Sequence, residues 1–417
     1  MESAFDGTAL DEVGRKAGFL KRARKITPAR LIPCLVAALG ASKVTSVADL
    51  ARTFGQMTGQ MLDERSFLGR LDTPSFPVLM KTVFLATAEK LAFEALRFLP
   101  GSPFNRFGRV LIQDGSSFAL DDGLAEIFPG RFRKNSPAAV ELHATLDLLT
   151  GQPHAVELSP DTTSERDFLP APETLTGLLL LADRGYPKFE YLAAVDRANG
   201  AFIMRSKANF TTPVLGVYQD GQLVDLEHPV PLVEYLAAHP KGPLDLVLQV
   251  VRGGQAHHFR FLALPTTKDR TYLITNLPRH TFSPEVVGLA YRLRWQVELM
   301  FREWKSHANL HRFATEKAPI AEGLIWASLL AALLTRFLAH AAQMVNKVTI
   351  STLKAAKMMN LCLPRLMQIV LDSSVTLISA LKDVLDDLAR FGKRAHPKRD
   401  QNHGREVLGL GPRFLNH

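Results

Sequence analysis

One nearly unbroken apolar segment, LTGLLLLADRGY (Leu175 to Tyr186), constrains the fold more than any other part of the sequence. A strand without polar alternation is typical of a sheet that is covered on both faces. The residues that follow continue this pattern: Pro187 to Ala198 has helical spacing, and AFIMRSK (Ala201 to Lys207) reads as another strand. These signals predict an α/β fold.

Two further strand signals precede this segment. The apolar run of RVLIQDGSSF (Arg109 to Phe118) is expected to end in a turn at Asp114-Gly115. VELHATLDLLTGQPHAVELS (Val140 to Ser159) alternates and is expected to form a hairpin that turns at Thr150-Gly151. Both patterns predict strands that join the same sheet.

The residues from Asn209 to Phe282 are also rich in strand signals, with hairpin turns expected at Asp220-Gly221 and Gly253-Gly254. A helix is expected to start directly after them, because Ser283-Pro284-Glu285 supplies an N-cap, a first-turn proline and an acid. The C-terminal third is predicted to be helical and to close with a basic tail.

The N-terminal hundred residues are predicted to be mostly helical. A basic segment, Gly14 to Ile32, leads into Ser46 to Leu71, where Ser46 caps a helix and a glycine-containing link leads to a second one. This pair is compatible with a DNA-binding helix-turn-helix, although short helix pairs are common. The net charge of +9 and the pI near 9.5 also favour a polyanionic partner such as nucleic acid.

The sequence is not expected to be that of a membrane protein, a disulfide-stabilised protein or a zinc-binding protein. The apolar run Gly323 to Leu334 is shorter than the roughly 20 residues that span a bilayer, so it is predicted to be a buried core helix. The N-terminus shows no signal sequence, which points to the cytoplasm. Cys34 and Cys362 lie far apart and have no metal-binding spacing.

YRLRWQVELMFREWK (Tyr291 to Lys305) is expected to be one continuous amphipathic helix. Its polar face combines one carboxylate with hydrogen-bonding and cationic side chains: Tyr291, Arg294, Glu298, Arg302 and Lys305. Its apolar face is predicted to pack on a core through Leu289, Ala290, Leu293, Val297, Met300, Phe301 and Trp304. The alternative is a surface helix stabilised only by ion pairs four residues apart.

Three carboxylates are candidates for a metal site. Asp114 and Asp183 each follow an apolar strand, and Glu298 lies on the helix described above. Carboxylate oxygens suit Mg²⁺ or Mn²⁺, and two such ions can promote phosphodiester cleavage while neighbouring cations hold phosphates. The alternative for each aspartate is a turn or a helix cap.

The sequence resembles transposases of the insertion sequence 4 family. The spacing of Tyr291, Arg294, Glu298 and Lys305 matches the YREK signature, and DGSSF and ADRGY resemble the two aspartate motifs of that family. The resemblance covers about Leu10 to Phe313 and is least distinct in the last hundred residues.

The resemblance implies a ribonuclease H-like core with a catalytic triad of Asp114, Asp183 and Glu298, which would also be the metal ligands. It implies a β-rich insertion before the glutamate helix and contacts from Tyr291, Arg294 and Lys305 to the phosphates at the transposon end. The implied reaction is hydrolysis at the end of the element, followed by attack of the freed 3′-hydroxyl on target DNA.

The expected organisation has five parts. They are a helical DNA-binding region (1–105), the first part of the core (106–208), the β-strand insertion (209–282), the second part of the core (283–345) and a helical region with the basic tail (346–417). Further contacts to double-stranded DNA are expected from Arg302, Arg22, Arg24 and Lys25, and a homodimer is expected in the active complex. The alternatives are a nuclease without strand transfer and an inactive DNA-binding remnant.

Several other polar residues have less specific expectations. His143 is expected to pack or hydrogen-bond, Asp147 is a candidate accessory carboxylate, and Arg292 and Glu303 are expected to be solvated. Trp295, Arg205 and Lys207 are either DNA contacts or ordinary exposed side chains. Arg294 and Lys305, as charges on a polar face, are expected to affect DNA processing more than stability.

Overall fold

The structure is a computed structural model of the 417-residue chain. It describes residues 5–22, 24–41, 46–209, 212–219, 221–252, 254–267, 269–307, 315–372, 377–395, 405 and 407–412. Most of the predicted basic tail therefore lies outside the described residues, as do Asp220 and Gly253 of the two predicted turns.

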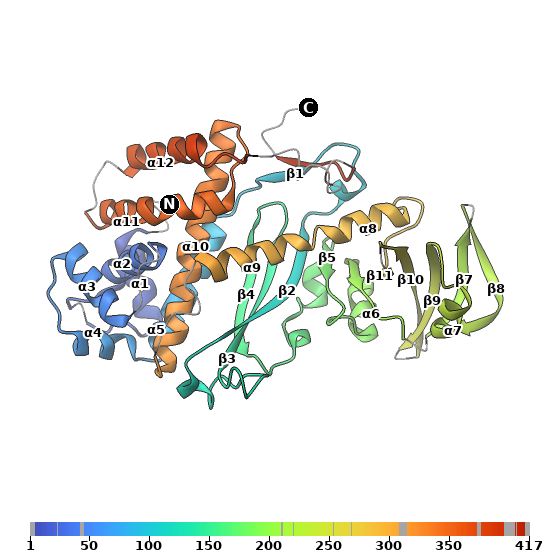
Figure 1. Cartoon of the computed structure of the whole chain (residues 1–417), viewed down its shortest axis with the longest axis horizontal. Coiled ribbons are helices and arrows are strands. Elements are labelled where there is room, and N and C mark those ends of the chain that lie inside the picture. The colour runs from blue at the N-terminus through green and yellow to red at the C-terminus, as the bar shows by residue number, and fades with distance from the viewer. Residues whose placement is uncertain are drawn as a thin grey trace.

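A ten-stranded mixed sheet runs through the molecule, in the order β4-β3-β2-β5-β6-β11-β10-β9-β7-β8 (Figure 1). Its strands are β2 (Val110–Ala119), β3 (Ala139–Asp147), β4 (Gln152–Pro160), β5 (Leu179–Ala182), β6 (Ala201–Arg205), β7 (Pro213–Gln219), β8 (Gln222–Pro231), β9 (Leu244–Arg252), β10 (Gln255–Pro265) and β11 (Arg270–Thr275). A separate pair joins β1 (Leu96–Phe98) to β12 (Leu410–Pro412).

Helices gather mainly at one end of this sheet (Figure 1). They are α1 (Gly7–Lys16), α2 (Pro28–Gly40), α3 (Val47–Thr58), α4 (Glu64–Leu71), α5 (Ser75–Leu91), α10 (Ala318–Asn346), α11 (Thr352–Leu371) and α12 (Leu377–Phe391). The others are α6 (Phe189–Arg197), α7 (Leu232–Ala238), α8 (Pro284–Arg292) and α9 (Trp295–His307). Helix α9 crosses β2 and β3 and links the sheet to the helical end (Figure 1).

The prediction of a strand covered on both faces is confirmed. All four residues of β5 are buried, and the strand is parallel to both β2 and β6. Leu179 and Leu181 belong to the main core, whereas Leu180 and Ala182 face a second core beneath α6. The alternate side chains of one strand thus fill two cores.

The turn predicted at Asp114-Gly115 is wrong. Strand β2 continues through both residues to Ala119 and pairs with β3 along its whole length. Gly115 is opposite His143, and a Cβ added at Gly115 would lie 2.6 Å from Glu141 Oε1. The glycine therefore admits a neighbouring side chain from the paired strand and does not reverse the chain.

The other local predictions are confirmed where the chain is described. The hairpin of β3 and β4 turns at Gly151, which has a φ of 65°. The Ser46 helix has a reciprocal capping box with Asp49, and a second helix follows it. Ser283 caps α8 by accepting from the Val286 amide at 3.3 Å.

Helix α10 contains the predicted apolar run and forms part of the core. Among the described residues it is the one helix long and apolar enough to cross a membrane by length and composition, but 72% of its apolar window is buried in the protein. It packs against α5, α2 and α12. The N-terminal and C-terminal helices therefore share the main core with β2, β3 and α9.

The strands predicted between Asn209 and Phe282 are present, and they extend the main sheet through the pairing of β11 with β6. A buried ion pair fixes this extension to the start of α8. Arg260 on β10 contacts Asp245 on β9 at 2.7 Å and donates to the Phe282 carbonyl at 2.6 Å. Arg279 is a second partner of Asp245 at 3.0 Å.

We expect Arg260→Ala to lower the free energy of unfolding by about 3–5 kcal/mol, because it leaves the buried Asp245 carboxylate with only Arg279. The matched control is Arg252→Ala in the adjacent strand, where the exposed pair with Glu190 should contribute less than about 1 kcal/mol. Urea denaturation of both variants measures the difference, and equal losses would contradict the structural role.

Candidate active site

The three predicted carboxylates line one open cleft. Asp114 lies in the middle of β2, Asp183 directly follows the adjacent parallel strand β5, and Glu298 is in the first turn of α9. The cleft is lined by Asp114, Gly115, Ser116, Asp183, Arg294, Glu298, Phe301, Arg302 and Lys305. The structure therefore brings residues separated by more than 180 positions to one place.

The prediction of one continuous helix from Tyr291 to Lys305 is wrong. Helix α8 ends at Arg292 and α9 begins at Trp295, with a tight turn between them in which the Arg294 amide donates to the Tyr291 carbonyl at 3.0 Å. The buried face nevertheless continues across the break. The buried residues are Ala290, Leu293, Val297, Met300, Phe301 and Trp304, while Leu289 is partly buried.

Arg294 lies between two of the carboxylates. Its guanidinium donates to Asp114 Oδ2 at 2.8 Å and also bonds Glu298 Oε1. The Arg294 side chain is only 13% exposed, so the expectation that it is an exposed charge is wrong. The Arg294–Glu298 pair predicted by the surface-helix alternative exists, but Arg294 also connects this helix to β2.

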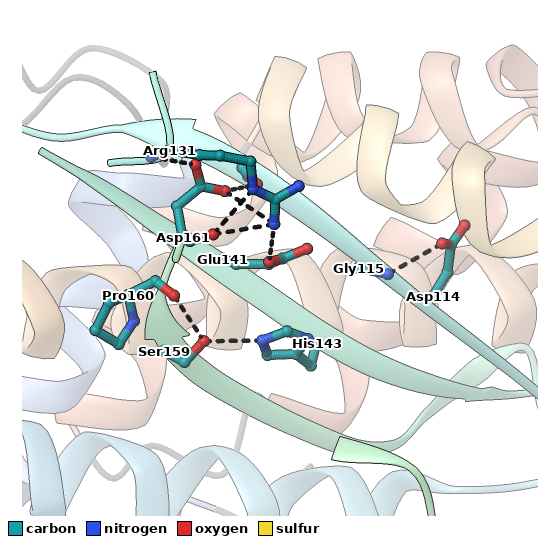
Figure 2. A network of polar contacts seen from close by, with 9 residues as sticks. Asp114, Gly115, Arg131, Glu141, His143, Ser159, Pro160 and Asp161 are labelled. Atoms are coloured by element: carbon teal, nitrogen blue, oxygen red, sulfur yellow. Dashed lines mark hydrogen bonds and ion pairs between the residues drawn. The ribbon is translucent and has the colours of Figure 1, made fainter. Parts of the chain in front are cut away.

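The electrostatic setting of Asp114 favours a further positive charge. Burial raises the pKa of Asp114 to about 6, although Arg294 and the Gly115 amide act in the opposite direction. The Gly115 amide donates to Asp114 Oδ1 at 3.0 Å (Figure 2). Negative charge on Asp183 and Glu298 adds to the upward shift of this pKa.

Asp183 has two partners from different elements. The Tyr291 hydroxyl donates to Asp183 Oδ1 at 3.1 Å, and burial raises the pKa of Tyr291, so the phenol remains a donor. Arg205 at the end of β6 comes within 3.9 Å of the same oxygen. Sequence reasoning gave Arg205 no specific role, although strand order alone would have placed it beside Asp183.

Lys305 and Arg302 lie farther along the cleft. Lys305 Nζ donates to the Ser117 carbonyl at 2.7 Å, and burial lowers the pKa of this lysine. Arg302 is exposed. All three cations of the predicted stripe thus line the cleft, with Arg294 innermost.

The other polar candidates lie outside the cleft. His143 is buried and lies 2.9 Å from Ser159 Oγ (Figure 2). Its ring also stacks on Phe168, in agreement with a packing role. Asp147 forms an ion pair with Arg109 at 3.1 Å. It lies three residues along β3 from Ala144, the residue opposite Asp114. It therefore does not contribute to the cleft.

Of the predictions for solvated residues in α8 and α9, one is confirmed and one is wrong. Arg292 is exposed, as predicted. Trp295 is half exposed, which fits both a DNA contact and an ordinary surface side chain. Glu303, which was expected to be solvated, pairs with Arg336 of α10 at 2.6 Å and is mostly buried. This pair fixes α9 to the long core helix.

The N-terminal cations form a different cleft. It is lined by Lys21, Arg22, Arg24, Lys25, Ile26, Leu62, Ser66 and Arg70. We call these residues the basic cleft. It lies between the basic segment and α4, the second helix of the predicted pair, and it contains no acidic residue. The structure therefore separates Arg22, Arg24 and Lys25 from the three carboxylates.

The donor set of the carboxylate cleft fits a hard divalent cation. Asp114, Asp183 and Glu298 supply oxygen ligands only, which is the donor type that hard divalent cations prefer. Within the described part of the chain, no three acidic, histidine or cysteine side chains already converge on one ion position. Binding of one ion by both Asp114 and Glu298 would therefore displace the Arg294 guanidinium.

Comparison with known proteins gives a consistent result. The transposase DDE domain family model matches residues 105–334, which is more than half of the chain. The transposase of insertion sequence element IS231B from Bacillus thuringiensis subsp. berliner is 24% identical over 93% of this chain and 89% of the relative. The IS1151 transposase of Clostridium perfringens is 22% identical over 94% of this chain and 91% of the relative.

Two other similarities are more limited. The putative transposase InsL of IS186A from Escherichia coli strain K12 is 44% identical over 62 residues, or 15% of this chain and 17% of the relative. A piggyBac transposase in a synaptic complex with hairpin DNA aligns with 92% of this chain and 84% of its own, at a TM-score of 0.46 and 12% identity. That likeness is too weak to establish a shared fold.

We expect Arg294→Ala to lower the melting temperature at about pH 8 in metal-free buffer and to lower it less at about pH 5. The variant leaves Asp114 and Glu298 without their shared counter-charge. The pKa of Asp114 is raised from 3.8 to about 6 in the folded protein, so the folded state binds this proton more tightly than the unfolded chain. Without Arg294 the pKa of Asp114 rises further, so the folded variant takes up this proton at a higher pH than the unmodified protein. The stability deficit of the variant therefore narrows as pH falls toward about 6, below which Asp114 is protonated in both folded proteins.

The matched control for this prediction is Arg302→Ala, which removes an exposed arginine of α9 from the same cleft. It should change the unfolding free energy by less than about 0.5 kcal/mol at either pH. Thermal melts at both pH values make the comparison. Equal, pH-independent changes in the two variants would show that Arg294 does not compensate the carboxylates.

Proposed function

Because the chain belongs to the transposase DDE domain family, we propose that it binds the ends of a mobile DNA element, cleaves them by phosphodiester hydrolysis and joins the freed 3′-hydroxyl ends to target DNA. In the first step water attacks phosphorus, the bond to the 3′ oxygen breaks, and that oxygen takes a proton. In the second step the 3′-hydroxyl attacks a target phosphodiester and displaces another 3′ oxygen.

The observation that carries the proposal is the single cleft containing Asp114, Asp183 and Glu298. We assign these residues as the catalytic triad and the core as ribonuclease H-like. The five-stranded unit β4-β3-β2-β5-β6 supports this assignment, because its adjacent parallel strands β2 and β5 present the two aspartates. Membership of the insertion sequence 4 family is part of the proposal.

The same three carboxylates would hold Mg²⁺ or Mn²⁺. When bound, such an ion polarises the phosphate and lowers the pKa of an attacking water. Arg294 stabilises the charge of Asp114 and Glu298 through its bonds to both carboxylates, and its guanidinium would become available to a DNA phosphate if an ion took its place as their counter-charge. Tyr291 orients Asp183 through its hydrogen bond at 3.1 Å.

The remaining cations of the cleft would bind the DNA backbone. Arg302 and Lys305 follow Glu298 along α9 and line the cleft with Arg294. Tyr291, which is bonded to Asp183, would complete the phosphate-binding set. Positive side chains contact phosphates without regard to sequence, so these residues would position the DNA. Recognition of the element's end would then depend on other parts of the chain.

We propose that the basic cleft performs part of that recognition. Its cations include Arg22, Arg24 and Lys25, and it adjoins the helix pair α3 and α4. The five regions 1–105, 106–208, 209–282, 283–345 and 346–417 are proposed as the organisation of the chain, with residues 209–282 as the β-rich insertion. The enzyme would act in the cytoplasm, as a homodimer that brings two ends together.

Two alternatives make different predictions. A ribonuclease H-like nuclease would cleave the same DNA without joining 3′-hydroxyl ends to a target, and an inactive remnant would bind without cleaving. An assay that scores both cleavage and joining on DNA bearing the element's inverted repeats separates all three. Cleavage without joining would favour the nuclease.

We expect Asp183→Asn to reduce end cleavage in Mg²⁺ by several orders of magnitude and to leave DNA affinity nearly unchanged. The amide cannot supply the negative charge that a divalent ion requires. The matched control is Glu190→Gln, an exposed carboxylate outside the cleft. Normal cleavage by Asp183→Asn, measured on labelled end DNA, would refute the triad.

We expect the triple variant Arg22→Ala, Arg24→Ala, Lys25→Ala to weaken DNA binding and to reduce its salt dependence. Each lost phosphate contact lowers the slope of log K against log salt by about 0.9, so three contacts give about 2.7. The full chain is the right sample, because α2 packs against α10 and α11.

The matched control for this triple variant is Lys16→Ala, an exposed cation of α1 that pairs with Glu12 and lies outside the basic cleft. Its salt slope should equal that of the unmodified protein. Binding isotherms at several salt concentrations provide the measurement. An unchanged slope in the triple variant would exclude the basic cleft from DNA binding.

A further inference from the structure

The loop between β2 and β3 presents an aromatic ring among cations. Its residues Gly130 to Ser136 read GRFRKNS and include no acid. We call them the basic loop. The Phe132 side chain is 68% exposed, and Arg133 and Lys134 are also exposed. Single exposed apolar side chains are ordinary, so exposure by itself indicates no function.

The basic loop has a defined conformation. The Ser136 amide donates to the Phe132 carbonyl at 2.8 Å, and the Gly130 amide donates to the Pro137 carbonyl at 2.7 Å. A Cβ at Gly130 would lie 2.0 Å from the Ser136 carbonyl oxygen, so only glycine allows this closure. The loop therefore holds Phe132 outward in a fixed frame and does not pack it on the core.

A buried polar network anchors the base of the loop. The Arg131 amide donates to Asp161 Oδ2 at 2.9 Å, and the Arg131 guanidinium donates to Glu141 Oε2 at 3.3 Å and to the Asp161 carbonyl at 3.0 Å (Figure 2). Both carboxylates are buried. The Arg131 side chain is thus occupied by contacts within the protein. Arg133 and Lys134 have no carboxylate partner among the ion pairs of the described residues.

The same network connects the loop to the candidate active site. Asp161 accepts from the Ser117 hydroxyl, and the Ser117 carbonyl accepts from Lys305 of the cleft at 2.7 Å. The basic loop lies in the connection between Ala119, the last residue of β2, and Ala139, the first residue of β3, and β2 also carries Asp114.

We propose that the basic loop grips the DNA beside the cleaved phosphate, with Phe132 stacked on an exposed base and Arg133 and Lys134 on the backbone. The proposal rests on the proposed function, because it takes the carboxylate cleft as the site of cleavage. A ring that stacks on bases beside cations that bind phosphates is a common combination at single-stranded or distorted DNA. Because the loop is already held in one conformation, it loses less conformational entropy when it binds DNA.

The experiment compares Phe132→Leu with Phe132→Trp in the full chain, using end DNA that carries 2-aminopurine at successive positions beside the cleaved phosphate. Loss of one stacked base should weaken binding about 5- to 100-fold in Phe132→Leu, while Phe132→Trp retains affinity. The fluorescence change of 2-aminopurine at one position should disappear only in the leucine variant. Arg133→Ala with Lys134→Ala should lower the salt slope by about 2.

The matched control is Phe391→Leu at the end of α12. Phe391 is also exposed and lies beside an arginine, with Arg390 Cζ 5.0 Å from the centroid of its ring. It should behave like the unmodified protein. Unaltered affinity and fluorescence in Phe132→Leu, with normal cleavage, would overturn this inference alone. Absence of DNA cleavage by the unmodified protein in Mg²⁺ would overturn the proposed function and this inference with it.

Discussion

The geometry of the cleft depends on one guanidinium held between two carboxylates. Asp114 on the sheet and Glu298 on α9 both bond Arg294, so this side chain joins the two elements that carry catalytic candidates. Two like charges about 4 Å apart repel by about 4 kcal/mol at the effective dielectric of a protein surface. Arg294 offsets that repulsion before any metal or DNA is present, which keeps the carboxylates together in a partly buried site.

Features determined by neighbouring residues were predictable from the sequence. The apolar strand ending at Ala182, the Gly151 hairpin and the Ser283 cap each follow from a few adjacent side chains, and all are present. The sequence also predicts the three carboxylates that line the cleft. Strand ends and helix faces limit where a carboxylate can lie, and Asp183 and Glu298 occupy such positions.

Features determined by distant residues were not predictable in the same way. The glycine after Asp114 indicated a turn, but Gly115 is required by Glu141 on the paired strand, 2.6 Å from where a Cβ would be. The helix break before Trp295 and the pairing of Glu303 with Arg336 likewise depend on β2 and α10. The spacing of apolar residues indicates which face of a helix is buried. It does not indicate where the helix is interrupted, because that depends on contacts with residues distant in the sequence.

The sheet extension also contributes to the cleft, although none of the described residues of the extension lines it. Arg260 bonds both Asp245 and the Phe282 carbonyl, and Phe282 immediately precedes Ser283, the N-cap of α8. Helix α8 then carries Tyr291 to Asp183. A rigid shift of β9 and β10 would therefore move the start of α8, and with it the hydroxyl that orients a candidate metal ligand. The strands of the sheet extension are thus mechanically coupled to the site through the buried Arg260–Asp245 ion pair.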